Sequence, residues 1–143
     1  MATVSAEIDI NAGPGEILDI IADLPTYPSW SSVHKRASID TTFCNGRPKR
    51  ATMSVSTAGL ADVQVLDYVW EGNGVSWSLV KSTSQRHQQG RYAITPGSNG
   101  ASHVHYELTI DPAIPVPGFL VRQVMKKAVD AATNGLKRRV ESS

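Results

Sequence analysis

The sequence predicts an α+β fold in which seven antiparallel strands form a curved sheet around one long C-terminal helix. Three observations lead to this prediction. From Pro117 to about Val140, apolar residues recur every three or four positions, which places them on one helical face. Segments of alternating apolar and polar residues fill the chain between residues 33 and 110. One further alternating segment and a short amphipathic segment come first, and strands that precede a long helix are typical of α+β architecture.

The N-terminal part is predicted to form a strand followed by one or two short helices. Alternation over Val4–Ile10 indicates a half-buried strand. Pro14 then stands near the start of an acidic turn, and isoleucines spaced for one helical face follow until Pro25 ends the helix. The segment Tyr27–Trp30 is expected to form a bend or a single helical turn whose two aromatic side chains are buried anchors.

Six further strands are predicted from alternation and from glycine-rich turns between them. In the third of these, the alternation changes phase between Val65 and Leu66, which predicts a bulge or a strong bend. The fifth begins within the polar segment Lys81–Gln89 and continues through Ile94. The remaining strands are expected at Val33–Ile39, Arg50–Ala58, Ala61–Glu71, Val75–Leu79 and Val104–Ile110.

A stiff connection leads into the C-terminal helix. Three prolines fall within Asp111–Gly118, and Pro117 suits the first turn of a helix, where a missing N–H is not needed. With a rise of about 1.5 Å per residue, the helix would extend roughly 36 Å. Its apolar stripe therefore needs one long apolar surface, which the sheet can supply. We expect the three turns at the sheet end where this helix begins to form a mobile entrance to the interior.

Composition and charge limit the class of protein. The 143 residues are expected to form a single domain, residues 1–143, and 41% hydrophobic with 19% charged residues suits a soluble globular protein. A net charge of +1 gives no reason to expect a nucleic-acid partner. The single cysteine, Cys44, excludes an internal disulfide, and no signal peptide or membrane span is recognisable. We therefore expect a cytoplasmic protein.

Several segments along the whole chain together resemble one known superfamily. These segments are Ile17-Leu18-Asp19-Ile20-Ile21-Ala22-Asp23-Leu24, Tyr27-Pro28-Ser29-Trp30, Gly90-Arg91-Tyr92, Tyr106-Glu107-Leu108, Val116-Pro117-Gly118 and Gly135-Leu136-Lys137. The pattern is similar to the helix-grip fold of the START and Bet v 1-like (SRPBCC) superfamily, and more narrowly to its bacterial polyketide cyclase/dehydrase and lipid-transport group. Such motifs specify architecture rather than activity.

The resemblance implies a ligand cavity between the concave sheet face and the long helix. Pockets with such a lining bind apolar ligands with a few polar groups. The alternative is that the same residues pack a solid core. The expected ligand-binding residues are Met53, Val55, Val65, Trp77, Leu79, Tyr92, Ile94, Val104 and Tyr106 of the sheet, with Val121, Met125 and Ala128 of the helix.

No catalytic, metal or cofactor site is predicted. His103 and His105 share one face of a strand, but that face should be the solvent side, so we expect surface histidines rather than metal ligands. No nucleophile elbow or phosphate-binding loop is present, and the setting of Cys44 gives no sign of a reactive thiol. The inward series offers mainly the hydroxyls of Tyr92 and Tyr106, with Tyr68 as a third candidate. These are few acid–base groups for the enolate chemistry of a cyclase.

Three hypotheses for the function follow. The first is non-catalytic binding or transport of a small hydrophobic ligand such as a lipid, quinone or polyketide. The alternative is an enzyme of the polyketide cyclase/dehydratase type, and the third is an interaction module with a filled core. We expect a monomer or weak dimer. The basic run Lys137–Arg139 suits the dipole of the helix and allows at most weak peripheral membrane contact.

Overall fold

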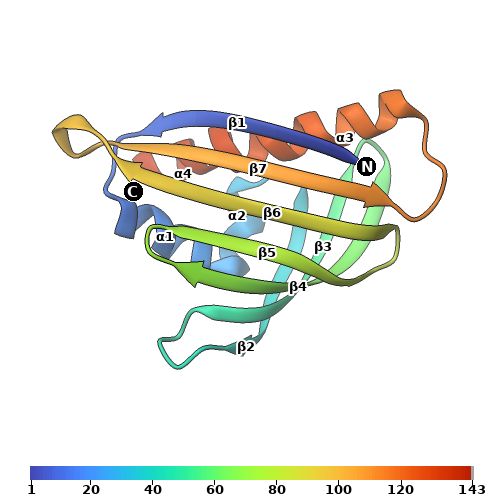
Figure 1. Ribbon diagram of the computed structural model, residues 1–143, viewed down its shortest axis with the longest axis horizontal. Helices are drawn as coiled ribbons and strands as arrows, with labels where there is room; N and C mark the ends of the chain where they lie inside the picture. The colour runs from blue at the N-terminus through green and yellow to red at the C-terminus, as the bar shows by residue number, and fades with distance from the viewer. Residues whose placement is uncertain (143) are drawn as a thin grey trace.

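A computed structural model describes residues 1–142, and within them seven antiparallel strands form one curved sheet (Figure 1). The strand order is β1-β7-β6-β5-β4-β3-β2, so the first strand pairs with the last and the others follow as a meander. The strands are β1 (Ala2–Ile10), β2 (His34–Thr42), β3 (Pro48–Thr57), β4 (Leu60–Glu71), β5 (Gly74–Ser82), β6 (Gln85–Pro96) and β7 (Ser102–Pro112). The predicted fold class is thus confirmed.

Short helices follow β1, and a long helix ends the chain. The first group comprises α1 (Pro14–Ala22), the 3₁₀ turn η1 (Leu24–Thr26) and α2 (Tyr27–Trp30). The C-terminal helix is continuous through α3 (Gly118–Asp130), one π-helical turn η3 (Ala131–Gly135) and α4 (Leu136–Glu141). It packs against β1, β3 and β7. No helix among residues 1–142 is both long and apolar enough to cross a membrane.

The π-helical turn ends at Gly135, which lies against Trp30 of α2. A Cβ atom added to Gly135 would lie 2.9 Å from the carbonyl oxygen of Trp30, so only glycine allows this approach. Such turns are uncommon and frequently occur at functional sites. Sequence periodicity predicted the helix but not this irregularity.

A bulge lies beside the predicted position in β4, but its extra residue belongs to β5, so the phase change predicted for β4 itself is wrong. Val65 pairs with Lys81 while Leu66 pairs with Leu79, so Val80 of β5 is the extra residue of a bulge. Along β4, however, burial alternates without a break, with the even-numbered positions from Asp62 onward facing inward. Val65 consequently faces the outer side of the sheet, not the interior as the sequence suggested.

Three turns gather at the end of the sheet where α3 begins, as predicted; we call this the α3 end (Figure 1, right). The turn between β5 and β6 is joined to β4 by a hydrogen bond from the Thr83 N–H to the Val63 carbonyl, 3.3 Å. The Ala113 N–H donates to the Ser84 carbonyl at 2.9 Å, which brings the connection into α3 to the same place. Whether this end opens remains a prediction.

Candidate functional site

A cavity of about 110 Å³ lies between the inner face of the sheet, α2 and the long helix. Strands β2 to β7 all contribute to its wall, whereas β1 does not. The lining residues are Tyr27, Trp30, Ser31, Val33, His34, Met53, Val55, Thr57, Gln64, Leu66, Tyr68, Trp77, Gln85, Gln88, Tyr92, Tyr106, Leu108, Ile110, Val124, Ala128, Ala131 and Ala132.

The structure brings half of the predicted ligand-binding set to this cavity. Those that line it are Met53, Val55, Trp77, Tyr92, Tyr106 and Ala128. Ile94, Val104 and Met125 are buried in the surrounding core instead, and Leu79 and Val121 pack against that core from partly exposed positions. Val65 lies on the outer face. The ligand-binding role of the lining residues remains a prediction.

Four aromatic rings form the central part of the wall, and we call them the aromatic floor (Tyr68, Trp77, Tyr92 and Tyr106). The ring of Trp77 lies across Gly90, because a Cβ atom added there would be 2.2 Å from two of its carbons. The three tyrosine rings surround that indole, with centroids 5.8 to 6.1 Å from its own. Glycine at position 90 therefore allows a flat indole surface beneath the cavity.

The three tyrosine hydroxyls of this floor have different partners. The Tyr92 hydroxyl donates to the carbonyl of Ala132 at 2.9 Å and so ties the floor to the π-helical turn. Within residues 1–142, the hydroxyls of Tyr68 and Tyr106 make no hydrogen bond; both residues are largely buried and line the cavity, but the two hydroxyl oxygens are accessible to water. Burial raises the pKa of all three phenols, so they stay protonated at neutral pH and can donate.

Next to the floor, three glutamines form a hydrogen-bonded group that we call the amide cluster (Gln64, Gln85 and Gln88). The Trp77 indole N–H donates to Oε1 of Gln88 at 3.0 Å. Nε2 of Gln88 in turn donates to Oε1 of Gln85 at 2.9 Å and of Gln64 at 3.3 Å. The cluster thus gives the α3 end of the cavity a polar, uncharged wall.

Behind the amide cluster lies one buried carboxylate, Asp62. It accepts from Nε2 of Gln64 at 2.9 Å, from the hydroxyls of Ser82 and Thr83, and from the backbone N–H groups of Thr83 and Ser84. Burial alone would raise the pKa of Asp62, but the hydrogen bonds from Thr83, Gln64, Ser82 and Ser84 outweigh it and lower that pKa. The carboxylate is therefore ionised at neutral pH, and it fastens the turn between β5 and β6 to β4.

The α2 side of the cavity carries a histidine and an unpaired donor. Nδ1 of His34 lies 2.7 Å from the hydroxyl of Ser31, and its ring meets that of Tyr27 edge-on. Burial lowers the pKa of His34 to about 4, so the imidazole is neutral at pH 7. The indole nitrogen of Trp30 is buried without a hydrogen-bond partner among residues 1–142.

The lining contains no Lys, Arg, Asp or Glu among the described residues. With His34 neutral and the phenols protonated, the cavity wall carries no formal charge at neutral pH. Sequence reasoning missed His34 and the amide cluster. Alternation along the strands was the only pattern that could have located these residues. It assigned them to the outer face instead, because polar positions of a strand are taken to face solvent.

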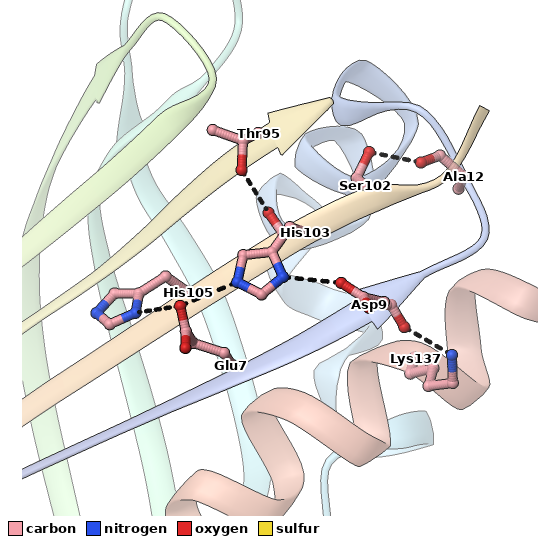
Figure 2. A network of polar contacts seen from close by, with 8 residues as sticks. All are labelled: Glu7, Asp9, Ala12, Thr95, Ser102, His103, His105 and Lys137. Carbon is pink, nitrogen blue, oxygen red and sulfur yellow. Dashed lines mark hydrogen bonds and ion pairs between the residues drawn. The ribbon is translucent and has the colours of Figure 1, made fainter. Parts of the chain in front are cut away.

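The paired histidines of β7 lie on the outer face of the sheet, as predicted. Nδ1 of His103 is 2.8 Å from Asp9 and its Nε2 is 2.9 Å from Glu7, while His105 approaches the same Glu7 at 3.6 Å (Figure 2). Hydrogen bonds to Glu7 and Asp9 raise the pKa of His103. The arrangement is a surface ion-pair group, and residues 1–142 contain no cluster suited to a metal ion.

Comparison with known proteins places this geometry in context. Residues 1–141 match the family described as polyketide cyclase/dehydrase and lipid transport. A START superfamily protein from Mycobacterium smegmatis superposes with a TM-score of 0.88 at 23% identity, covering 98% of this chain and 97% of its own. A Thermus thermophilus protein gives 0.82 at 19% identity, covering 99% and 98%.

A third similar structure is an enzyme by name. The Zhui aromatase/cyclase from a Streptomyces species superposes with a TM-score of 0.84 at 10% identity, covering 98% of this chain and 93% of its own. Identities this low indicate a shared fold and not a shared activity. No protein with curated annotation matches the sequence.

Proposed function

The chain belongs to the polyketide cyclase/dehydrase and lipid transport family, and on this basis we propose that it binds or carries a small hydrophobic ligand without catalysis. The ligand would occupy the cavity above the aromatic floor. The observation that carries the proposal is this uncharged cavity, whose wall is mainly apolar and aromatic with a few fixed polar groups. A cytoplasmic carrier or sensor is the corresponding role.

Small side chains on the long helix account for the empty space. Ala128, Ala131 and Ala132 face the cavity, where larger residues would fill it. Its volume of about 110 Å³ is below the range of roughly 300–1,000 Å³ common for ligand pockets. A ligand must therefore be small, or the cavity must enlarge on binding. The loops at the α3 end are the natural place for such movement.

The titratable groups of the lining favour binding over catalysis. General acid–base catalysis works best with groups whose pKa values lie near the operating pH. Burial instead moves the phenol pKa values upward and lowers that of His34 to about 4. None of these groups is thus prepared to exchange protons at neutral pH.

A polyketide cyclase/dehydratase is the alternative function. The specific observation in its favour is the neutral imidazole of His34, oriented by Ser31 within the same cavity as two free phenol hydroxyls. In this reading His34 would accept a proton next to a ketone and a tyrosine would hydrogen-bond the developing enolate. Incubation with a poly-β-ketone should leave it unchanged if the carrier proposal holds; cyclised product that disappears in His34→Ala would favour the enzyme.

Partners other than the ligand are expected to be few. Lys137 donates to Glu141 at 2.8 Å and to the Asp9 carbonyl, while Arg138 is exposed and Arg139 is partly exposed. We propose at most weak contact of these two arginines with anionic membranes, and a monomer or weak dimer in solution.

Native mass spectrometry of the purified protein tests the proposal directly. The expected spectrum contains a bound species heavier than the chain by the mass of one small apolar molecule, which organic extraction removes and identifies. The same spectrum reports the oligomeric state. A protein that is free of adducts and takes up none of several apolar probes would contradict a carrier.

A further inference from the structure

Two tyrosine hydroxyls face the cavity with no partner in the protein, and this suggests what the ligand must offer. We propose that the cavity selects an uncharged ligand, one oxygen atom of which accepts hydrogen bonds from Tyr68 and Tyr106. The inference rests on the proposed function, because it requires that a ligand occupies this cavity. It narrows that function by excluding carboxylate and phosphate ligands.

The hydrogen bonds of the cavity wall leave several donors without a protein acceptor. Buried polar groups in folded proteins almost always have a partner, so each exception needs an explanation. Tyr92 meets this rule through the Ala132 carbonyl, and Gln88 meets it through three neighbours. The hydroxyls of Tyr68 and Tyr106 have no partner in the protein and are accessible to water, whereas the indole N–H of Trp30 in the same wall is buried and unpaired. A carbonyl or ether oxygen of a ligand would supply the missing acceptor.

The uncharged wall disfavours an anionic ligand. Taking an anionic head group out of water costs far more free energy than taking a neutral oxygen, and a nearby cation is the usual compensation. No Lys or Arg lines the cavity among the described residues, and His34 is neutral. The ionised Asp62 lies directly behind Gln64, so the one nearby full charge would repel a carboxylate or phosphate. A neutral oxygen acceptor avoids both the desolvation cost of an anion and the repulsion by Asp62.

The shape of the aromatic floor suits a planar ligand. The Trp77 ring lies flat across Gly90 and is bordered by the rings of Tyr68, Tyr92 and Tyr106. Such a surface favours offset stacking with a planar ring system over contact with a flexible chain. The ligand chemistry that satisfies all three arguments is a neutral aromatic molecule with a ketone, quinone or ether oxygen.

Calorimetric titration with three probes of one shape tests the selection. Acetylnaphthalene carries a neutral carbonyl, ethylnaphthalene replaces it with hydrocarbon, and naphthoate replaces it with an anion. The wild type should bind the ketone at least about tenfold more tightly than naphthoate. Tyr106→Phe and Tyr68→Phe should each weaken ketone binding roughly fivefold and leave ethylnaphthalene binding unchanged, since each removes one hydrogen bond of ordinary strength.

Tyr92→Phe is the matched control, because its hydroxyl lies in the same floor but already has a protein partner. It should not change the preference for the ketone. Equal binding of naphthoate and the ketone, or an equal loss in all three variants, would overturn the inference while leaving a carrier intact. If none of the three probes binds, the proposed function fails and the inference fails with it. Thermal melts of each variant confirm that the protein titrated is folded.

Discussion

The two faces of the sheet differ in the charge and the hydrogen bonding of their polar side chains. On the outer face, charged side chains pair in the open, as Arg50 does with Asp67 at 2.7 Å. On the inner face, polar groups are uncharged, except for Asp62, whose carboxylate is fully hydrogen-bonded. Exposed pairs contribute little to stability, whereas an unsatisfied buried group is expensive. Polar residues on the inner face are therefore expected to have a specific role. Asp62 and Tyr92 have a structural role, and we propose that Tyr68 and Tyr106 recognise the ligand.

The largest predicted effect is at Asp62. Asp62→Ala removes the acceptor of Gln64 and of the turn formed by Thr83 and Ser84, which leaves several buried donors unpaired. We expect a loss of about 3 kcal/mol in the free energy of unfolding, measured by urea denaturation. The outer-face control Asp67→Ala should cost far less. Similar losses in the two variants would remove the distinction between the faces.

The carboxylate of Asp62 also predicts a dependence on pH. Its pKa is lower in the folded protein than the ordinary value of 3.8. Its contribution to stability is thus complete above that value and is lost as the pH falls through the folded pKa. Acid titration of stability should show a smaller decline for Asp62→Asn than for the wild type. Parallel curves would assign the acid sensitivity to other groups.

The next effect in size concerns Gly90, which makes room for Trp77. In Gly90→Ala the new methyl group would collide with the indole ring, so we expect a loss of roughly 1–3 kcal/mol in urea denaturation and a changed near-UV spectrum. Gly15→Ala is the control, because Gly15 lies in α1 with nothing within 4 Å of an added Cβ. It should stabilise the protein by up to about 1 kcal/mol. A neutral Gly90→Ala would mean that the indole can move freely.

The tyrosines of the aromatic floor sharpen the comparison within the inner face. Tyr92→Phe breaks the hydrogen bond to Ala132 and should lower the free energy of unfolding by about 1 kcal/mol. Tyr106→Phe removes a hydroxyl without a protein partner and should leave stability nearly unchanged. Equal losses in thermal or urea melts of the ligand-free variants would show that both hydroxyls serve the fold.

The smallest predicted effect is on the outer face, at His103. Its pKa is raised above 6.5 by Glu7 and Asp9, so its contribution is complete below that pH and disappears as the pH rises through the folded pKa. Because the group is exposed, the change should be slight and should vanish in high salt. Comparison of the wild type with His103→Gln between pH 6 and pH 9 measures it. A large difference in the free energy of unfolding would mean that an ion pair on the outer face contributes as much to stability as a polar contact on the inner face.

The fold could be predicted from the sequence because most strands show their inward face as an apolar series. In β3, Ala51 and Met53 are buried as the alternation indicates, and in the last hairpin Tyr92 pairs with Tyr106. The long helix was equally clear from its apolar spacing. These features depend on burial alone, and burial leaves a readable pattern in residue types.

The site could be predicted only in part, because its distinguishing residues break that pattern. Asp62 and Gln64 occupy inward positions that alternation reserves for apolar residues, so Val65 was assigned to the wrong face. Gln88 and His34 were hidden in the same way. Their burial depends on partners from other strands, such as the contact of Gln88 with Trp77, and those partners are separated along the chain.

The central claim, that a ligand occupies the cavity, is tested most directly by Ala128→Trp. Ala128 faces the cavity from the long helix, so the new ring can fill the existing space. We predict that the variant keeps nearly its full stability in urea but no longer takes up acetylnaphthalene. If the interior cannot accommodate the ring, overpacking should cost about 1–3 kcal/mol or more. A strongly destabilised variant, beside a wild type that takes up no probe, would contradict the cavity and the carrier function together.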